Sequence, residues 1–498
     1  MVCRIAQTVG IKHPTLPRSG LRLSVSHVRS ILILQENMEF VNQKAFFQGR
    51  YHSLCFLIVS SEKMCYHKKK EEKREFMAHG GKQSNPWIFL KNFTKWSLLG
   101  LSMGVIGGLL GAGFHHVLHF VTHLRQENNW LIFLLPLAGL LSVGIYRISG
   151  LRSNRGTNEI IDAALDGHPL KPQITPVIFS AATITHLFGG SAGREGAALQ
   201  LGGSVASLLG RLFKLGLEDR KVMIMCGMSA VFAGLFGTPL TAALFCMEFE
   251  SVGTLFSPAL LPCYLAAFTA SKISALLGVH AEGLLLETVT AVTLTNVWKF
   301  AILAVLLSFL GIVMCTIFHK AEHLSAHRIK NPWLRIFLGG LVIMGMTLLV
   351  GDQRFNGAGM DMALAAVEGR ADWYSFLLKL LFTAVTLAAG FKGGEIVPTF
   401  CIGATFGCVI GGLLGLDAGL CGALGLVGLF CCATNSPFAS IVLSVEMFGS
   451  QNLHLFALVC ALCFVLSGNT GLYSSQIIQF SKASTLMDEE SKRFIKRK

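Results

Sequence analysis

Uninterrupted apolar runs, rather than alternating apolar and polar positions, dominate the chain after about residue 85. A hydrocarbon core about 30 Å thick requires about 20 apolar residues in a helix. Runs that reach or approach this length lie at residues 97–114, 130–146, 254–271, 300–318, 336–350 and 455–467. Because backbone groups in lipid must be hydrogen-bonded within their own segment, these runs predict membrane-spanning helices.

Two further apolar regions, residues 176–213 and 376–430, are interrupted by glycine. Their shorter pieces predict re-entrant helices that cross only half of the membrane. The 53 glycines of the chain favour close helix packing and helix starts inside the protein. The pattern therefore predicts an all-α integral membrane protein with broken helices.

The membrane part of the sequence is similar to itself. Several residues recur in the same order and with nearly the same spacing, which predicts two structural repeats at residues 86–290 and 291–480. The matched residues are Phe114, His115, His119, His123, Trp130, Glu195, Pro239 and Glu248, paired in order with Phe318, His319, His323, His327, Trp333, Glu395, Pro437 and Glu446. Repeats in a membrane protein typically place a substrate site near mid-bilayer, where broken helices meet.

Composition excludes an ordinary soluble domain, in which about a quarter of the residues are charged. Here 52% of the residues are hydrophobic and 14% are charged. The net charge of +14 lies mostly in the two tails, residues 1–85 and 481–498. A positive-inside bias explains this distribution, so we expect lipid rather than nucleic acid as the partner.

The tails differ from the membrane part. Residues 1–85 lack a spanning run and predict a disordered cytosolic tail; the alternative is a later translation start, at Met64 or Met77. Residues 481–498 form a basic C-terminal tail. The 14 cysteines are scattered through apolar segments without metal-site spacing, which predicts free, buried thiols and no metal or other cofactor.

The candidate chemistry lies in the glycine-rich stretch 189–196. A helix that starts after such a stretch leaves backbone NH groups unpaired, and its dipole adds positive charge, so the stretch attracts an anion. Glu195 lies within it, and a carboxylate inside a membrane is costly and usually functional. The alternative is a glutamate that only complements the helix dipole.

Three motifs resemble the CLC family of anion channels and proton-coupled anion antiporters: Gly193-Arg194-Glu195-Gly196, Gly394-Glu395-Ile396-Val397-Pro398 and Gly471-Leu472-Tyr473-Ser474. The resemblance covers roughly residues 90–480. It implies a CLC-type inverted repeat and a homodimer with one pathway per subunit. It also implies that Glu195 gates the outer end of the anion path and carries protons in antiporters.

The resemblance further implies that Tyr473 helps to close the inner end of the path; an interfacial aromatic anchor is the alternative. A carboxylate held over a helix N-terminus competes with the anion for the same donors, and protonation releases it. In the second repeat, the amides of Glu395, Ile396 and Val397 are expected to face the site. The predicted anion-binding residues are Gly193, Arg194, Gly196, Glu395, Ile396, Val397, Tyr473 and Arg155.

Two positions depart from the family pattern. Arg155 replaces the family's anion-binding serine, and it is either a direct anion ligand or a loop arginine turned toward cytosolic water. Glu395 and Ile396 replace an aliphatic residue and a phenylalanine. The extra carboxylate resembles a bacterial branch that includes fluoride exporters, so chloride is not assumed.

The family's inner proton route is also altered. Counting from Pro239, Glu248 falls on the first residue of the family's glutamate pair, and Phe249 falls on the second, proton-handling residue. Glu250 follows one residue later. Glu248 and its repeat partner Glu446 are expected to be structural residues near helix ends, where charged side chains snorkel.

The histidine sets have the i, i+4 spacing of one helix face. Because the pattern is duplicated without a matched extra ligand, we expect packing or interfacial histidines. A metal site and proton sensing are the alternatives.

The sequence therefore predicts a multi-pass protein of the plasma (inner) membrane that transports chloride, fluoride or nitrate, as a channel or coupled to protons. The alternative is another inverted-repeat transporter, for a cation or an organic solute. We do not expect an enzyme, because no nucleophile and base arrangement is present.

Overall fold

The computed structural model describes residues 86–151, 155–280, 283–286, 293, 296–478 and 482. The predictions for the N-terminal tail and for most of the C-terminal tail lie outside these residues. Everything that follows concerns the compact unit Trp87–Lys498, together with Pro86, where its first helix begins.

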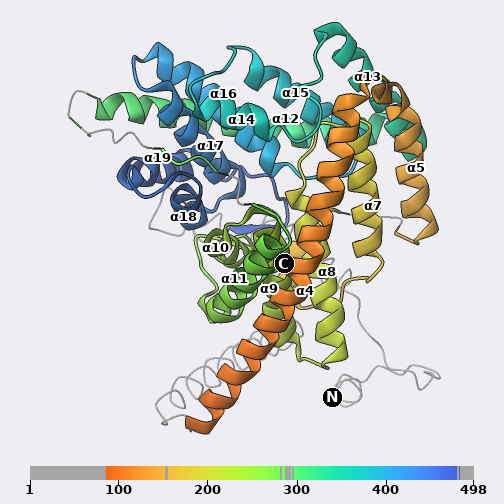
Figure 1. The fold of residues 1–498 in the computed structure, drawn as a ribbon, viewed down its shortest axis with the longest axis vertical. Helices are drawn as coiled ribbons and strands as arrows, with labels where there is room; N and C mark the ends of the chain where they lie inside the picture. The colour runs from red at the N-terminus through yellow and green to blue at the C-terminus, as the bar shows by residue number, and fades with distance from the viewer. Residues whose placement is uncertain are drawn as a thin grey trace, which may run out of the picture. The chain divides into compact units, whose positions relative to one another are not determined.

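Helices make up nearly all of the regular structure (Figure 1). The helices before residue 290 are α4 (Pro86–Glu127), η1 (Asn129–Leu134), α5 (Leu135–Ile148), α6 (Thr157–Asp166), α7 (Ile174–Leu187), α8 (Glu195–Leu212), α9 (Leu217–Phe236), α10 (Pro239–Glu248), η2 (Ser257–Ala259) and α11 (Leu260–Leu276). Those after residue 290 are α12 (Val297–Arg328), α13 (Pro332–Val350), α14 (Met360–Val367), α15 (Ser375–Ala389), α16 (Ile396–Leu413), α17 (Ala418–Thr434), α18 (Pro437–Phe448) and α19 (Leu453–Leu466). Two short strands, β1 (Ser251–Val252) and β2 (Ile477–Ile478), pair in parallel.

Six helices in the described part of the chain are long and apolar enough to cross a membrane. They are 86–127, 129–148, 257–276, 297–328, 332–350 and 396–413. All but one of the predicted spans are confirmed. The predicted run 455–467 was wrong as a full span, because it forms α19, which has 14 residues. The interrupted region 176–213 forms α7 and α8, as expected for broken helices. In the region 376–430 the expectation of half-spanning pieces was wrong for α16, which is long and apolar enough to cross a membrane. The chain is a multi-pass membrane protein.

The helices follow the same order in both halves. A long helix, α4 or α12, comes first, and α8 and α16 each have 18 residues. In each half the helix that follows this 18-residue helix packs against it through glycines. A methyl group at Gly202 would overlap the carbonyl of Gly227, and one at Gly403 would overlap the carbonyl of Gly425. Such close packing of small residues is typical of helices in membranes and supports the predicted repeats.

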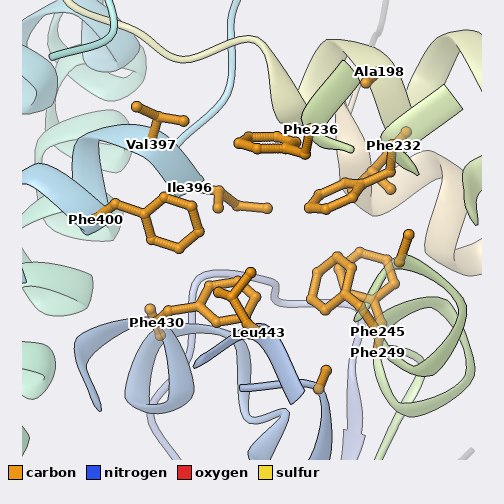
Figure 2. Close-up of a cluster of buried hydrophobic side chains, with 14 of the residues drawn as sticks. Ala198, Phe232, Phe236, Phe245, Phe249, Ile396, Val397, Phe400, Phe430 and Leu443 are labelled. Carbon is orange, nitrogen blue, oxygen red and sulfur yellow. The ribbon is translucent and has the colours of Figure 1, made fainter. Parts of the chain in front are cut away.

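A ring of phenylalanines joins the two halves at the centre (Figure 2). Neighbouring rings in it lie 4.9 to 6.4 Å apart between centroids, in the tilted, stacked and edge-to-face arrangements that aromatic pairs prefer. In order around the ring they are Phe232, Phe236, Phe400, Phe430 and Phe245. Because three come from α9 and α10 and the others from α16 and α17, the core closes only when both halves are in place.

Two glutamates hold α10 and α18 together reciprocally. Glu248, at the end of α10, accepts hydrogen bonds from two amides at the start of α18, at 2.9 and 3.2 Å. Glu446, in α18, accepts two from the start of α10, at 2.9 and 2.8 Å. These contacts agree with the predicted structural role. The predicted reason was wrong, because each carboxylate caps the partner helix rather than snorkelling to water.

The cysteines that the structure describes are all free and buried. The prediction of free thiols is therefore confirmed for this part of the chain.

Replacing Glu446 with alanine should lower the free energy of unfolding by roughly 2 kcal/mol, because two amides of α10 lose a charged acceptor. The measurement is the thermal unfolding midpoint in detergent. Glu218→Gln is the control, since that side chain is 79% exposed. Equal midpoints for Glu446→Ala and the control would show that the reciprocal caps do not stabilise the fold.

Candidate functional site

Two helix starts, one from each half, meet inside the membrane domain. The backbone of Gly193, just before α8, forms an antiparallel bridge with Gly394, just before α16. The amide of each glycine donates to the carbonyl of the other, at 2.7 and 2.6 Å. The N-termini of α8 and α16 therefore lie side by side.

This approach requires glycine. A Cβ atom at Gly394 would lie 2.6 Å from the amide nitrogen of Gly196 and 3.0 Å from that of Glu195. A Cβ at Gly193 would lie 3.0 Å from the ring of Pro398 and would also overlap the Glu195 carboxylate. The glycines of both motifs are thus explained by contact across the two halves.

The side chain of Glu195 reaches from one half to the other. It is 0% exposed, and its Oε2 atom accepts a hydrogen bond from the amide of Val397 in the first turn of α16, at 3.2 Å. Its Oε1 atom lies 3.9 Å from Nε of Arg194 and accepts no hydrogen bond from the described residues. The carboxyl group of Glu195 therefore already occupies the N-terminus of α16, the place where an anion is attracted.

A cavity of about 450 Å³ lies next to this carboxylate, and we call it the Arg194 cavity. Nη1 of Arg194 lies 3.1 Å from Nδ1 of His115, and its guanidinium stacks on the ring of Phe236. Among the residues that line the cavity are His115, His119, His123, Arg194, Asp361 and Val397. The first histidine set therefore faces a cavity rather than packing in the core. In the described part of the chain no group of metal-ligating side chains could hold a metal ion.

A second cavity, of about 260 Å³, lies next to Tyr473, and we call it the Tyr473 cavity. The ring of Tyr473 packs edge-on against Phe249, with 4.7 Å between centroids. Its hydroxyl is buried and has no hydrogen-bond partner among the described residues. His319 also lines this cavity and contacts the carbonyl of Gly471 at 2.8 Å. Repeat-related histidines, His115 and His319, therefore line two separate cavities.

The segment that carries Tyr473 is fixed from both halves. The side chain of Gln476 donates to the carbonyls of Phe249 and Thr434, at 2.9 and 2.8 Å. Arg155 donates to the hydroxyl of Ser475 at 3.2 Å. These bonds hold Tyr473 between the end of α10 and the end of α17.

Arg155 forms no ion pair or hydrogen bond with Glu195; its partners are Asp162 and Ser475. Its side chain is 57% exposed and bonds Asp162 at 2.5 Å as well as Ser475. The structure thus brings it to the Tyr473 segment. Its role as an anion ligand stays a prediction.

Glu395 is the N-cap residue of α16. Its carbonyl accepts hydrogen bonds from the amide and hydroxyl of Thr399, at 3.0 and 2.8 Å. Its side chain is partly buried and makes no hydrogen bond to another described residue. The motif residues Gly193, Arg194, Gly196, Glu395, Ile396 and Val397 therefore gather at the two helix starts. Tyr473 lies close enough to interact electrostatically with Glu195 and Glu395, and Arg155 is bonded to the segment that carries Tyr473.

Sequence reasoning missed Lys379 in α15. This lysine is 0% exposed and donates to the hydroxyl of Ser191 and to the carbonyls of Gly357 and Phe355, at 3.0, 2.7 and 3.2 Å. A lysine inside an otherwise apolar run was the available indication, because an ionisable residue inside a membrane is usually functional.

Repeated helices that are broken at a shared, buried carboxylate define the protein as a membrane transport protein of the inverted-repeat type. The sequence profile of the family described as voltage gated chloride channel matches residues 138–468. The chain belongs to this family, the CLC family. The alternative of an unrelated transporter for a cation or an organic solute is thereby set aside.

Similar proteins support this assignment. The chain is 35% identical over 409 residues to a chloride/fluoride channel protein of Pseudomonas syringae, covering 80% of this chain and 90% of that one. It is 24% identical over 442 residues to the H(+)/Cl(-) exchange transporter ClcA of Vibrio cholerae, covering 80% and 93%. A crystal structure of a CLC-type fluoride/proton antiporter is similar with a TM-score of 0.75 and 34% identity, covering 78% of this chain and 98% of that one.

The contact between the two helix starts can be tested with alanine at Gly394. The added methyl should separate the Gly193–Gly394 bridge and destabilise the protein by about 1 to 3 kcal/mol, as overpacking typically does. Gly412→Ala is a matched control, because no atom lies within 4 Å of a Cβ at that glycine. The thermal unfolding midpoint is measured for both. A similar midpoint for the two variants would contradict the close approach.

Proposed function

We propose that the protein transports a small inorganic anion across the membrane and that Glu195 closes the anion path beside the Arg194 cavity. The observation that carries this proposal is the hydrogen bond from the Val397 amide to the Glu195 carboxylate. A carboxylate is an anion, so a helix start that binds it can also bind a transported anion.

Glu195 is held more weakly than the structural glutamates. Glu248 and Glu446 each accept two amide hydrogen bonds of 2.8 to 3.2 Å, whereas Glu195 accepts one at 3.2 Å, and its second oxygen has no hydrogen bond and lies 3.9 Å from Nε of Arg194. Fewer charge-assisted bonds mean that less free energy is lost on release. Glu195 is thus suited to leave its site, while the other two are suited to stay.

Release couples the anion to a proton. A protonated carboxyl group has no net charge, so its attraction to the helix start and to Arg194 weakens. The side chain then leaves, and the anion takes the amide of Val397. Return of the carboxylate expels the anion and frees the proton. Proton and anion thus alternate at one place.

The Tyr473 cavity provides the other end of the path. The buried hydroxyl of Tyr473 has no partner within the described residues and can donate to an anion. The amides of Gly196 and Ile396 are the remaining backbone donors of the proposed site, since the amide of Gly193 already donates to the carbonyl of Gly394. Arg155 adds positive charge near Tyr473, where Asp162 keeps part of that charge paired.

Fluoride is the anion that we propose first, with chloride as the alternative. A relative at 35% identity is named a chloride/fluoride channel protein, and a solved structure at 34% identity is named a CLC-type fluoride/proton antiporter. The carboxylate of Glu395 beside the site supports proton-coupled transport, because it offers a second group that can bind a proton. We also propose a homodimer with one pathway per subunit, on the basis of the family resemblance.

Replacing Glu195 with glutamine should leave anion flux but make it independent of pH, and should reduce coupled proton movement to the background level. Glutamine cannot bind a proton or restore a negative charge at the α16 N-terminus. Purified protein in liposomes is tested for fluoride, chloride and proton flux, with Glu127→Gln as an exposed control. A wild-type protein that moves a cation and no halide would contradict the proposal.

Replacing Tyr473 with phenylalanine should weaken anion binding about tenfold, which corresponds to about 1.4 kcal/mol, because one hydrogen bond to the anion is lost. Binding is measured by calorimetry in fluoride and in chloride. Tyr264→Phe is the matched control, since Tyr264 is an exposed tyrosine of α11. Unchanged affinity in the Tyr473 variant would remove the hydroxyl from the proposed path.

A further inference from the structure

Lys379 is a buried ammonium whose three N–H bonds are all used. It donates to one hydroxyl, Ser191, and to two carbonyls, Gly357 and Phe355. No carboxylate lies within ion-pair distance of it in the described part of the chain. A buried cation without a counter-charge is costly, so its contacts must be well formed for the fold to tolerate it.

The contacts of Lys379 converge on the loop that leads to Glu195. Ser191 lies four residues before Glu195. Its hydroxyl also contacts the Thr383 hydroxyl at 3.0 Å, and its amide donates to the Thr386 hydroxyl at 3.1 Å. Lys379, Thr383 and Thr386 all belong to α15, so one helix of the second half fixes this loop of the first half.

The same lysine fixes the loop before α14. Gly357 and Phe355 lie in that loop, and the amide of Gly357 also donates to the carbonyl of Gly190 at 3.0 Å. The side chain of Asn356 donates to the carbonyl of Gly189 at 2.7 Å. Lys379 therefore lies where two loops and one helix meet, just ahead of the Gly193–Gly394 bridge.

The arrangement is not repeated in the other half. The repeat counterpart of α15 is α7, and its sequence contains no lysine. Thr386 of α15 corresponds to Thr185 of α7, because each hydroxyl donates to the carbonyl one turn earlier in its own helix. Lys379 has no corresponding lysine in α7. Among the described residues, a lysine of α15 holds the loop before Glu195, whereas α7 offers no lysine to the loop before Glu395. This asymmetry coincides with the helix start that carries the carboxylate proposed to be released.

We propose that Lys379 is a positioning residue that sets how firmly Glu195 closes the anion path, by holding the Gly190–Arg194 loop through Ser191. This inference rests on the proposed function. The Glu195 carboxylate meets the Val397 amide by a single bond of 3.2 Å, so a small displacement of the loop weakens closure. The lysine acts through the loop and does not itself touch the anion.

The direction of the effect follows from the competition at the Val397 amide. A looser loop weakens the docked, charged form of Glu195 and leaves its protonated form unchanged. Fewer protons are then needed to open the path, and anion flux persists to higher pH. The other titratable or charged groups near Glu195 and this loop are Arg125, His115, His186, Arg194, Glu395 and Tyr473.

The test compares Lys379→Met and Ser191→Ala with wild-type protein in liposomes. Both variants should move the midpoint of the pH dependence of anion flux upward, by about one unit for Lys379→Met and less for Ser191→Ala; one unit is a tenfold lower proton concentration. Ser308→Ala is the matched control, because Ser308 is a buried serine of α12 whose hydroxyl bonds to the Ala304 carbonyl and to Cys463 of α19, and not to the loop before Glu195. Ser191→Ala decides the matter if Lys379→Met does not fold.

Hydrogen exchange of the amides at residues 189–196 is measured on the same proteins and does not depend on transport. Faster exchange in Ser191→Ala than in Ser308→Ala, together with the shifted midpoint, supports the proposal. If the variants lower the melting temperature or the flux but leave the pH midpoint of anion flux unchanged, the proposal is overturned, because Lys379 then has only a structural role. If the amides of residues 189–196 exchange slowly in wild-type protein but this protein moves no anion, the proposed function is overturned instead. The gating role of Lys379 then falls with it.

Discussion

Unpaired amides at helix starts inside a membrane are the constraint on which this structure depends. In water such groups would be solvated, but within the bilayer they need an acceptor from the protein or from a ligand. The chain brings the starts of α8 and α16 together through the Gly193–Gly394 bridge. The glycine contacts between neighbouring helices and the phenylalanine ring keep the two halves close enough for this (Figure 2). The resulting cluster of donors must bind something negative.

The molecule meets this need in the same way at more than one place. Glu248 caps a helix of the other half, Glu446 does so in return, and Glu195 binds the start of α16. The first two use both carboxylate oxygens and belong to the scaffold. Glu195 uses one, and the amide that it occupies lies beside a cavity lined by Arg194 and histidines. We propose that this interaction between a carboxylate and helix-start amides stabilises the fold where both oxygens are bonded, and serves transport at Glu195, where one oxygen is bonded.

The sequence predicted the membrane class, nearly all of the long spans and the place of Glu195, because apolar length and glycine-rich helix starts are local properties. It did not predict the reciprocal caps or the contacts of Lys379. The caps and the bond from Lys379 to Ser191 pair residues 188 to 206 positions apart, and no local pattern says which helix start a carboxylate will reach. Arg155 shows the same difficulty, since its bond to Ser475, 320 positions away, depends on where the Tyr473 segment returns.

The central claim is that a carboxylate and the transported anion compete for one set of amides. The most direct test is the number of protons taken up when an anion binds, obtained by calorimetry at mildly alkaline pH in buffers with different ionisation enthalpies. Competition predicts that about one proton is bound with each anion in wild-type protein, and none in Glu195→Gln. Anion binding of full affinity without proton uptake in wild-type protein would contradict the account.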